Sequence, residues 1–184
     1  MPLSQLDEKA ALIVIDLQKG IVGLPLLHPG AEIVERSAEL ARAFRVKGLP
    51  VVLVNVTAGA PGRTDAGSPK FAFPEGWDEL VPELEQAPED ILVSKQRVGA
   101  FIGTELDKTL RELGVTQVFL TGIATSAGVA ATAFSAYDLA YNVVLVVDAM
   151  TDRDAEMQAF FVEKVFPRRG ETETTENVLK VLGA

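Results

Sequence analysis

The chain contains no cysteine, and this absence excludes several kinds of site. Without a thiol there is no disulfide, no thiolate metal site and no thiol nucleophile. Histidine is almost absent too, because His28 is the only one in 184 residues. A histidine-rich metal site therefore cannot be assembled, and no His-x-His or HExxH pattern occurs. Glycine-rich phosphate loops of the common patterns are also missing. We expect neither a metal ion nor another cofactor.

Long hydrophobic runs and an excess of basic residues are also lacking. No apolar stretch approaches the roughly 18 residues that a membrane-spanning helix needs. The first residues, MPLSQLDEKAALIVID, show no basic leader and no cleavage site. Lys and Arg number 17 against 26 Asp and Glu, a formal net charge of −9. Such a surface repels phosphate backbones and anionic lipids. We therefore expect a cytoplasmic protein whose partner is a small molecule, with no nucleic acid and no membrane.

What is present is an ordinary globular composition, with 48% hydrophobic and 23% charged residues. The length suits one domain, which we place over residues 1–184. Short apolar runs rich in β-branched residues predict strands buried on both faces. They lie at residues 10–15, 50–56, 91–93, 117–121 and 142–147, with a weaker candidate at 164–167.

Segments with helical periodicity alternate with these strands, at residues 31–47, 104–113, 126–140, 154–162 and 174–182. Gly48 and Gly114 follow two of them, where a left-handed residue ends a helix. Alternating strands and helices predict an α/β fold, a Rossmann-like three-layer α/β/α sandwich around a parallel sheet. The Gly- and Pro-rich segment 57–76 is too long for a plain connector and is typical of a binding lid or a mobile loop.

Ligands of such sheets bind beyond the carboxyl ends of the strands, so the polar residues there are the candidates for a site. Asp16 follows the first strand, Asn55 and Thr57 end the second, and Lys95 follows the third. Burial would raise the pKa of Asp16 unless a cation lies nearby; a turn-forming role is the alternative. Lys95 is either a solvated loop residue or the partner of Asp16, placed to stabilise negative charge.

The turn after the fourth strand, residues 122–126, leads into a helix of small residues. Helix N-termini expose N–H groups that suit an oxyanion or a carboxylate, although Ser126 as a simple helix cap explains the same pattern. A nucleophilic Ser126 is disfavoured because no histidine is available to activate it. Phe71, Phe73 and Trp77 could wall a pocket beneath the long loop or could pack in the core.

Three motifs and the closing helical region carry a resemblance to a known family. The motifs are ALIVIDLQ, SKQRVGAFIGTELDKTLRELGV and VFLTGIATSAGVAATAFSAYDLAYNVVLVVDAMTD. In order and spacing they resemble the isochorismatase-like hydrolase superfamily over nearly the full length. The resemblance implies a six-stranded parallel sheet flanked by helices, and a homodimer or homotetramer.

The resemblance also implies a set of site residues. Most similar members hydrolyse amides with an aspartate, a lysine and a cysteine, which here correspond to Asp16, Lys95 and Gly128, so the nucleophile is missing. A cis peptide would join Ile123 to Ala124. The implied substrate-binding residues are Gln18, Asn55, Ile123, Ala124, Thr125 and Gly128.

Isochorismatases resemble this pattern because some also have glycine at the nucleophile position. Their reaction protonates a vinyl ether and adds water, without a covalent intermediate. The resemblance thus favours an isochorismatase-like hydrolase that uses Asp16 as acid and base. The alternatives are an inactive member that binds a small molecule or has a structural role, and an amidohydrolase that uses water directly. This chain reads Ala124, Thr125, Ser126 where isochorismatases have a Tyr-Ala-His-type turn, and Arg63 is only a loose match to their carboxylate-binding arginine.

Overall fold

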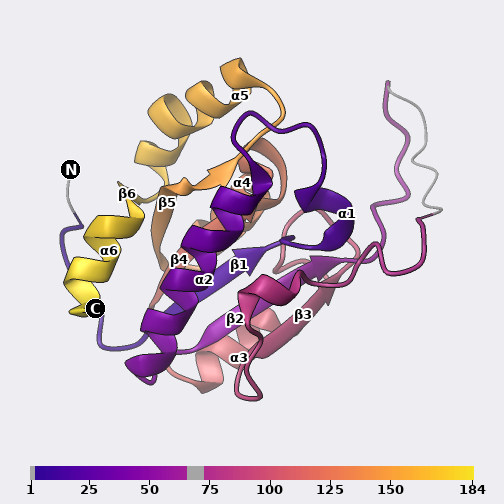
Figure 1. Cartoon of the computed structure of the whole chain (residues 1–184). Helices are drawn as coiled ribbons and strands as arrows, with labels where there is room; N and C mark the ends of the chain where they lie inside the picture. Colours follow the sequence, from indigo (N-terminus) through magenta and orange to yellow (C-terminus); the bar gives the residue numbers. More distant parts are fainter. Residues whose placement is uncertain (1–2, 66–72) are drawn as a thin grey trace.

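Six parallel strands form one sheet at the centre of the molecule (Figure 1). The computed structural model describes residues 3–65 and 73–184. In spatial order the sheet is β3-β2-β1-β4-β5-β6. The strands are β1 (Ala10–Ile15), β2 (Val51–Val56), β3 (Ile91–Lys95), β4 (Gln117–Ile123), β5 (Asn142–Thr151) and β6 (Glu171–Glu173). Strand order reverses beside β1, so the carboxyl ends of β1 and β4 flank the switch point at which such sheets bind ligands.

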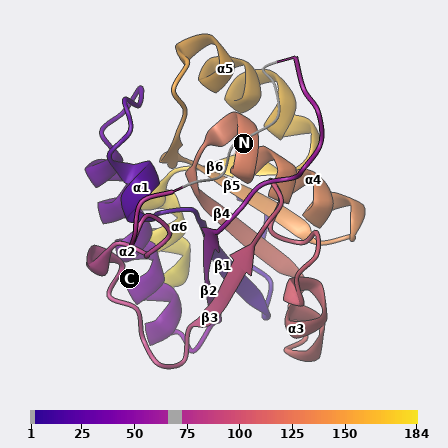
Figure 2. The same cartoon turned by 90° about the vertical axis from the view of Figure 1, so that its right-hand side faces the viewer.

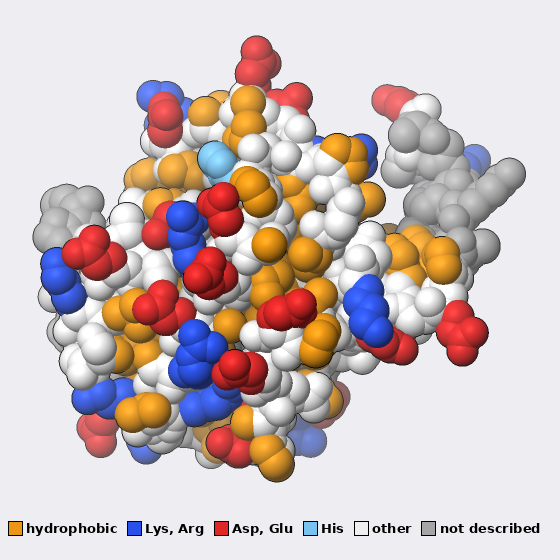
Figure 3. All heavy atoms as spheres, in the orientation of Figure 1, with side chains coloured by type: hydrophobic (Ala, Val, Ile, Leu, Met, Phe, Trp, Pro, Cys, Tyr) orange, Lys and Arg blue, Asp and Glu red, His pale blue; other side chains and the backbone are white. Residues whose placement is uncertain are grey.

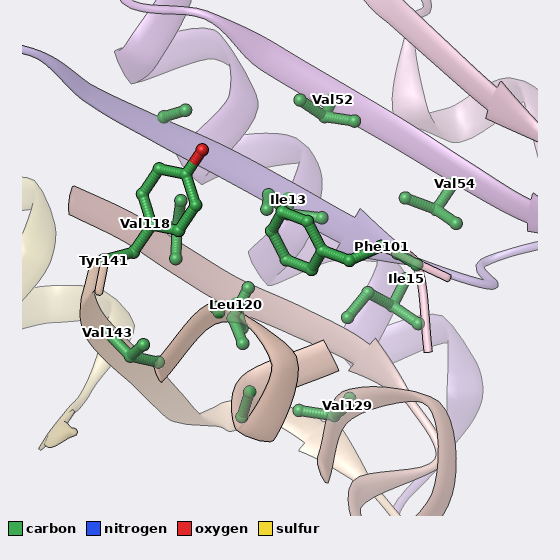
Figure 4. Packing of buried hydrophobic residues seen from close by; sticks show 14 of the residues in the cluster. Ile13, Ile15, Val52, Val54, Phe101, Val118, Leu120, Val129, Tyr141 and Val143 are labelled. Atoms are coloured by element: carbon green, nitrogen blue, oxygen red, sulfur yellow. The ribbon is translucent and has the colours of Figure 1, made fainter. Parts of the chain in front are cut away.

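The central strands are apolar because both of their faces are covered. Every residue of β1 is buried, and its side chains alternate between two hydrophobic clusters: Leu12 and Val14 belong to one, Ile13 and Ile15 to the other. Figure 4 shows the second cluster, where Ile13 and Ile15 pack with residues of β2, β4 and β5. This two-sided burial explains the continuous apolar runs.

Helices cover both faces of the sheet. Figure 2 shows α1 (Lys19–Val22), α2 (Gly30–Val46) and α6 (Thr175–Leu182) on one side, and α3 (Leu106–Glu112) and α4 (Ala130–Asp138) on the other. The remaining helical segments are η1 (Pro82–Leu84), η2 (Thr125–Val129), α5 (Ala155–Phe160), η3 (Phe161–Val165) and η4 (Phe166–Arg168). The α/β/α architecture and the parallel sheet are therefore confirmed.

Most predicted elements lie within a few residues of the observed ones, and the helix stops are confirmed. Gly48 and Gly114 have φ angles of 65° and 72°, the left-handed conformation that glycine adopts without steric cost. The predicted helix 126–140 is divided, because residues 125–129 form the π-helical turn η2 before α4 begins.

The prediction of a strand at residues 164–167 is wrong. These residues continue the helical path of η3 and η4, and the sixth strand is Glu171–Glu173. Pro167 has no N–H for a strand ladder, while Phe166 satisfies its apolar character by packing into the core. Strand β6 has no apolar pattern because it lies at the sheet edge, where short and charged sequences are common.

The surface agrees with the composition. On the face that carries α2 and α6, acidic and basic side chains are interspersed (Figure 3). Along residues 3–65 and 73–184, no helix combines the length and the apolar character needed to cross a bilayer.

Candidate active site

Asp16 lies directly beyond β1, at the carboxyl edge of the sheet. Its φ of 55° is left-handed, a conformation that aspartate tolerates better than most residues at a cost of about 1 kcal/mol. Its backbone N–H still donates to the Val54 carbonyl at 2.9 Å. The chain therefore remains in the sheet while changing direction, and the Asp16 side chain enters a cleft above the strand ends.

Lys95, the last residue of β3, forms an ion pair with Asp16. Its Nζ lies 2.7 Å from Asp16 Oδ2, and the two side chains are 2% and 6% exposed. Strand β2 lies between β1 and β3, so the gap between their axes is about 10 Å. Only a long side chain can cross it, and the aliphatic stem of lysine does so. The sequence hypothesis that the carboxylate and the amine meet is supported by this geometry.

Burial and the lysine act in opposite directions on the Asp16 carboxyl. Removal from water disfavours the charged form and is the larger effect, while the charge and the hydrogen bond of Lys95 favour that form. The net result raises the pKa of Asp16 to about 6. The carboxyl can therefore both donate and accept a proton near neutrality, as acid–base catalysis requires.

The second carboxyl oxygen of Asp16, Oδ1, accepts no hydrogen bond from any residue that the structure describes. Oδ1 is buried and makes no hydrogen bond within the described residues. An unsatisfied buried acceptor costs free energy, and such groups call for an explanation. Because the Asp16 side chain lines the cleft, a bound molecule is the natural partner of this oxygen.

The turn between β4 and η2 forms the next wall of the site. The peptide bond between Ile123 and Ala124 is cis, as the resemblance implied. Gly128 lies beyond it, and a Cβ at this position would meet Asp16 Oδ2 and Ile15 Cγ2, each at 3.1 Å. Glycine therefore leaves the space beside the Asp16 carboxyl open.

The cleft itself has a volume of about 450 Å³, which is the size range of small-molecule sites. Its walls are mostly apolar and come from several segments. Trp77 and Phe73 stack with ring centroids 3.7 Å apart, and both line the cleft. The start of the long segment 57–76 lines it as well, through residues 58–60. Phe71 lies outside the described residues. The aromatic rings form a wall and leave the cleft open.

Three residues implied to bind substrate do not line this cleft. The Gln18 side-chain amide donates to the backbone carbonyls of Val56 and Trp77 and accepts from the Val56 N–H. It therefore links these two segments next to the cleft without lining the cleft itself. The Asn55 side chain donates to the Asp78 carbonyl and accepts from the Ser94 hydroxyl. Thr125 is fully buried, and its hydroxyl has no partner among the described residues. Ile123, Ala124 and Gly128 do line the cleft, beside Asp16 and Lys95.

Ser126 contacts Asp152 and not the Asp16–Lys95 pair. Its backbone N–H donates to Asp152 Oδ2 at 2.7 Å, and its side chain also bonds to this carboxylate. These bonds, with others from the backbone, lower the pKa of Asp152 although burial opposes them. Asp152 thus anchors the start of η2, and Ser126 does not line the cleft. The acidic partner leaves Ser126 without a base of suitable pKa, as expected from the lack of histidine.

Sequence reasoning missed one charged residue of the cleft. Arg153 follows β5 and lines the cleft. Arg97, which follows β3, lines it too, and strands β2, β1 and β4 lie between β3 and β5. The rule that identified Asp16 and Lys95, a polar residue just beyond a strand end, applies equally to Arg153. The predicted strand ended at residue 147, whereas β5 continues to Thr151 across a register shift against β4, and this hid the position. Within the described part of the chain, no group of His, Asp and Glu side chains could hold a metal ion.

Comparison with known proteins places this geometry in a family. The isochorismatase domain profile matches residues 10–177. The isochorismatase family protein YecD of Escherichia coli O157:H7 is 37% identical over 181 residues, covering 94% of this chain and 95% of YecD. The structure of an isochorismatase family protein from Burkholderia thailandensis superimposes with a TM-score of 0.94 at 38% identity, covering 100% of this chain and 99% of that one.

An amidohydrolase also appears among the relatives. The ureidoacrylate amidohydrolase RutB of Variovorax paradoxus is 32% identical over 178 residues, covering 80% of this chain and 71% of RutB. The domain match, the near full-length similarity and the shared fold agree with the buried pair of Asp16 and Lys95. The chain therefore belongs to the isochorismatase family.

Proposed function

We propose that this protein is a hydrolase that cleaves a small vinyl ether through Asp16 acid–base catalysis, without a covalent intermediate. The observation that carries the proposal is the state of the Asp16 carboxyl. Lys95 holds Oδ2, whereas Oδ1 is buried in the cleft and has no hydrogen-bond partner among residues 3–65 and 73–184. One oxygen is thus fixed and the other is free to exchange a proton with a substrate.

In the proposed reaction, protonated Asp16 gives its proton to the terminal carbon of the enol ether. The double bond supplies the electron pair for the new C–H bond, and an oxocarbenium ion forms at the other carbon. Water adds there and returns a proton to Asp16. The resulting hemiketal then breaks its C–O bond and yields a ketone and an alcohol. One ether and one water are consumed, and the carboxyl ends as it began.

The raised pKa makes this role possible near neutrality. With a pKa of about 6, roughly one tenth of the Asp16 carboxyl is protonated at about pH 7, against about one thousandth for an ordinary aspartate. The increase in the reactive form is therefore on the order of a hundredfold. Lys95 acts as a positioning residue, because its bond to Oδ2 orients Oδ1. Gly128 provides room beside the carboxyl for the substrate.

A second function, amide hydrolysis with water as the direct nucleophile, is favoured by the similarity to an amidohydrolase. A thioester cannot form here because Gly128 has no side chain. Ionised Asp16 would instead act as a base toward water. A third alternative is a family member that binds a small molecule without converting it, and the buried pair beside an open cleft argues against it.

The test is a hydrolysis screen over isochorismate-like vinyl ethers and small amides. Asp16→Asn should reduce turnover by about a hundredfold or more, since proton transfer by a positioned side chain contributes that much. Asp138→Asn is the matched control, because Asp138 is an exposed carboxylate at the end of α4. Turnover that survives Asp16→Asn would refute the mechanism. Binding without turnover of any compound would favour the third alternative.

A further inference from the structure

Helix α5 presents large apolar side chains to solvent. Within this helix Gln158 is the buried residue, whereas Met157 and Phe160 are 43% and 55% exposed. A surface helix ordinarily turns its apolar stripe toward the core and its polar side chains toward water. In α5 a polar side chain lies inside and apolar ones lie outside. Exposed apolar surface of this kind marks a site of interaction.

The exposed apolar surface continues on α4. Phe134 and Tyr137 lie one turn apart on this helix and are 36% and 49% exposed. The Arg169 guanidinium lies over both rings, 5.8 Å from the Phe134 centroid and 5.4 Å from the Tyr137 centroid. These two rings therefore lie on the side of α4 that faces the segment after α5.

Contacts join the two helices into one surface. Phe160 contacts Phe161, and Phe161 contacts Phe166, with ring centroids 5.9 Å and 5.7 Å apart. The Phe166 carbonyl in turn accepts from the Arg169 N–H at 2.8 Å. Helix α5 also contacts η2, the turn that leads into α4, and Figure 2 shows α4 and α5 on one side of the molecule. We call this surface the α4–α5 face, and it consists of Phe134, Tyr137, Met157 and Phe160.

The size of the α4–α5 face fits a stable dimer. At about 200 Å² for a whole aromatic residue, Phe134, Tyr137 and Phe160 together expose roughly 300 Å². Each partner of a stable dimer buries about 800 Å², of which roughly 65% is apolar. The three rings thus supply about half of the apolar area that one partner buries, and Met157 adds to it.

The charges around this face favour a second copy of the chain as its occupant. The whole chain carries a net charge of −9, so most encounters between two copies are repulsive. On α4 and residues 153–169, however, the exposed charged side chains are four acidic and four basic ones, which sum to zero. In a twofold dimer the same patch meets itself, and a patch with both signs can place opposite charges together. A strongly charged partner would find no complementary field here.

We propose that a second copy of this chain docks on the α4–α5 face, with α4 and α5 of each copy packed against those of the other about a twofold axis. Phe160 and Tyr137 are the most exposed rings of the face and anchor the contact. Association is measured without a substrate, so this inference and the proposed function fail separately.

The test is sedimentation velocity of the full chain from about 1 to about 100 µM, a range that reaches the weak end for interfaces of this size. The wild type should sediment at twice the chain mass of 19.7 kDa. Phe160→Glu and Tyr137→Glu each place a carboxylate in the face, from two different helices. Val181→Glu is the matched control, because Val181 is a 45% exposed apolar residue of α6, on the other side of the sheet. Far-UV circular dichroism and urea unfolding check that each variant is folded.

Phe160→Glu and Tyr137→Glu should each raise the Kd of the dimer about tenfold or more, the loss that an anchor residue typically gives. Val181→Glu adds the same charge elsewhere and should change the Kd by less than about a factor of two. A wild type that stays monomeric throughout overturns the proposal and favours a different protein as the occupant. A dimer that the folded face variants leave intact, or that Val181→Glu weakens equally, overturns it as well.

Discussion

The buried Asp16 carboxyl should make the stability of the protein depend on pH in a specific direction. The perturbation is Asp16→Asn, which removes the titrating group and keeps a side chain of similar shape. The quantity of interest is the free energy of unfolding of the wild type minus that of the variant, followed from about pH 4 to about pH 7. The subtraction cancels the titration of groups that both proteins share.

The magnitude follows from the pKa of Asp16, which is about 6 in the folded protein against an ordinary value of 3.8. Because the folded pKa is the higher one, the folded state binds more protons between these values, and stability falls as pH rises through that window. The full difference is worth about 3 kcal/mol at roughly 1.36 kcal/mol per pKa unit. About 2 kcal/mol of this falls between about pH 4 and about pH 7.

The assay is urea unfolding followed by far-UV circular dichroism at a series of pH values, with m-values checked for two-state behaviour. Asp138→Asn serves as control, since this exposed carboxylate should leave the difference from wild type flat. A difference between wild type and Asp16→Asn that is flat, or that rises with pH, would refute the reasoning. Attraction to Lys95 would then outweigh burial, and Asp16 would be ionised throughout the neutral range.

Three further outcomes are expected. With Asp16 as the acid, kcat/KM for a vinyl ether should fall as pH rises through about 6; a rise through the same pH would instead indicate the base role of amide hydrolysis. Gly128→Ala should reduce kcat about tenfold or more, because the added Cβ would lie 3.1 Å from Asp16 Oδ2. Gly62→Ala is the control and should leave kcat unchanged, because a Cβ there would meet nothing within 4 Å. Ser126→Ala should keep most of the activity, since its backbone N–H, which remains, makes the 2.7 Å bond to Asp152; complete loss of activity would reopen the serine mechanism.

Part of the fold could be read from local sequence. The apolar runs of β1 and β2 are continuous because helices cover both faces of these strands. A continuous apolar run does not identify β6, because its residues Glu171–Glu173 have no hydrophobic pattern. Its pairing with β5 joins residues that are far apart in the sequence, and no local property of the segment predicts this pairing.

The candidate site divides in the same way. The sequence by itself placed Asp16 and Lys95 at the carboxyl ends of predicted strands, and parallel strands bring their carboxyl ends to one edge of the sheet. It also determined that no thiol is present at position 128.

Only the tertiary structure decided which side chains converge. Strand side chains alternate between faces, so Lys95 reaches the cleft, while Asn55 points away and pairs with Ser94. The competition between burial and Lys95 over the Asp16 proton depends on depth and distance, which exist only after folding. Arg153 lies at the site for the same reason, because β5 continues to Thr151 through its pairing with β4 beyond the register shift, which no local property of the segment predicts.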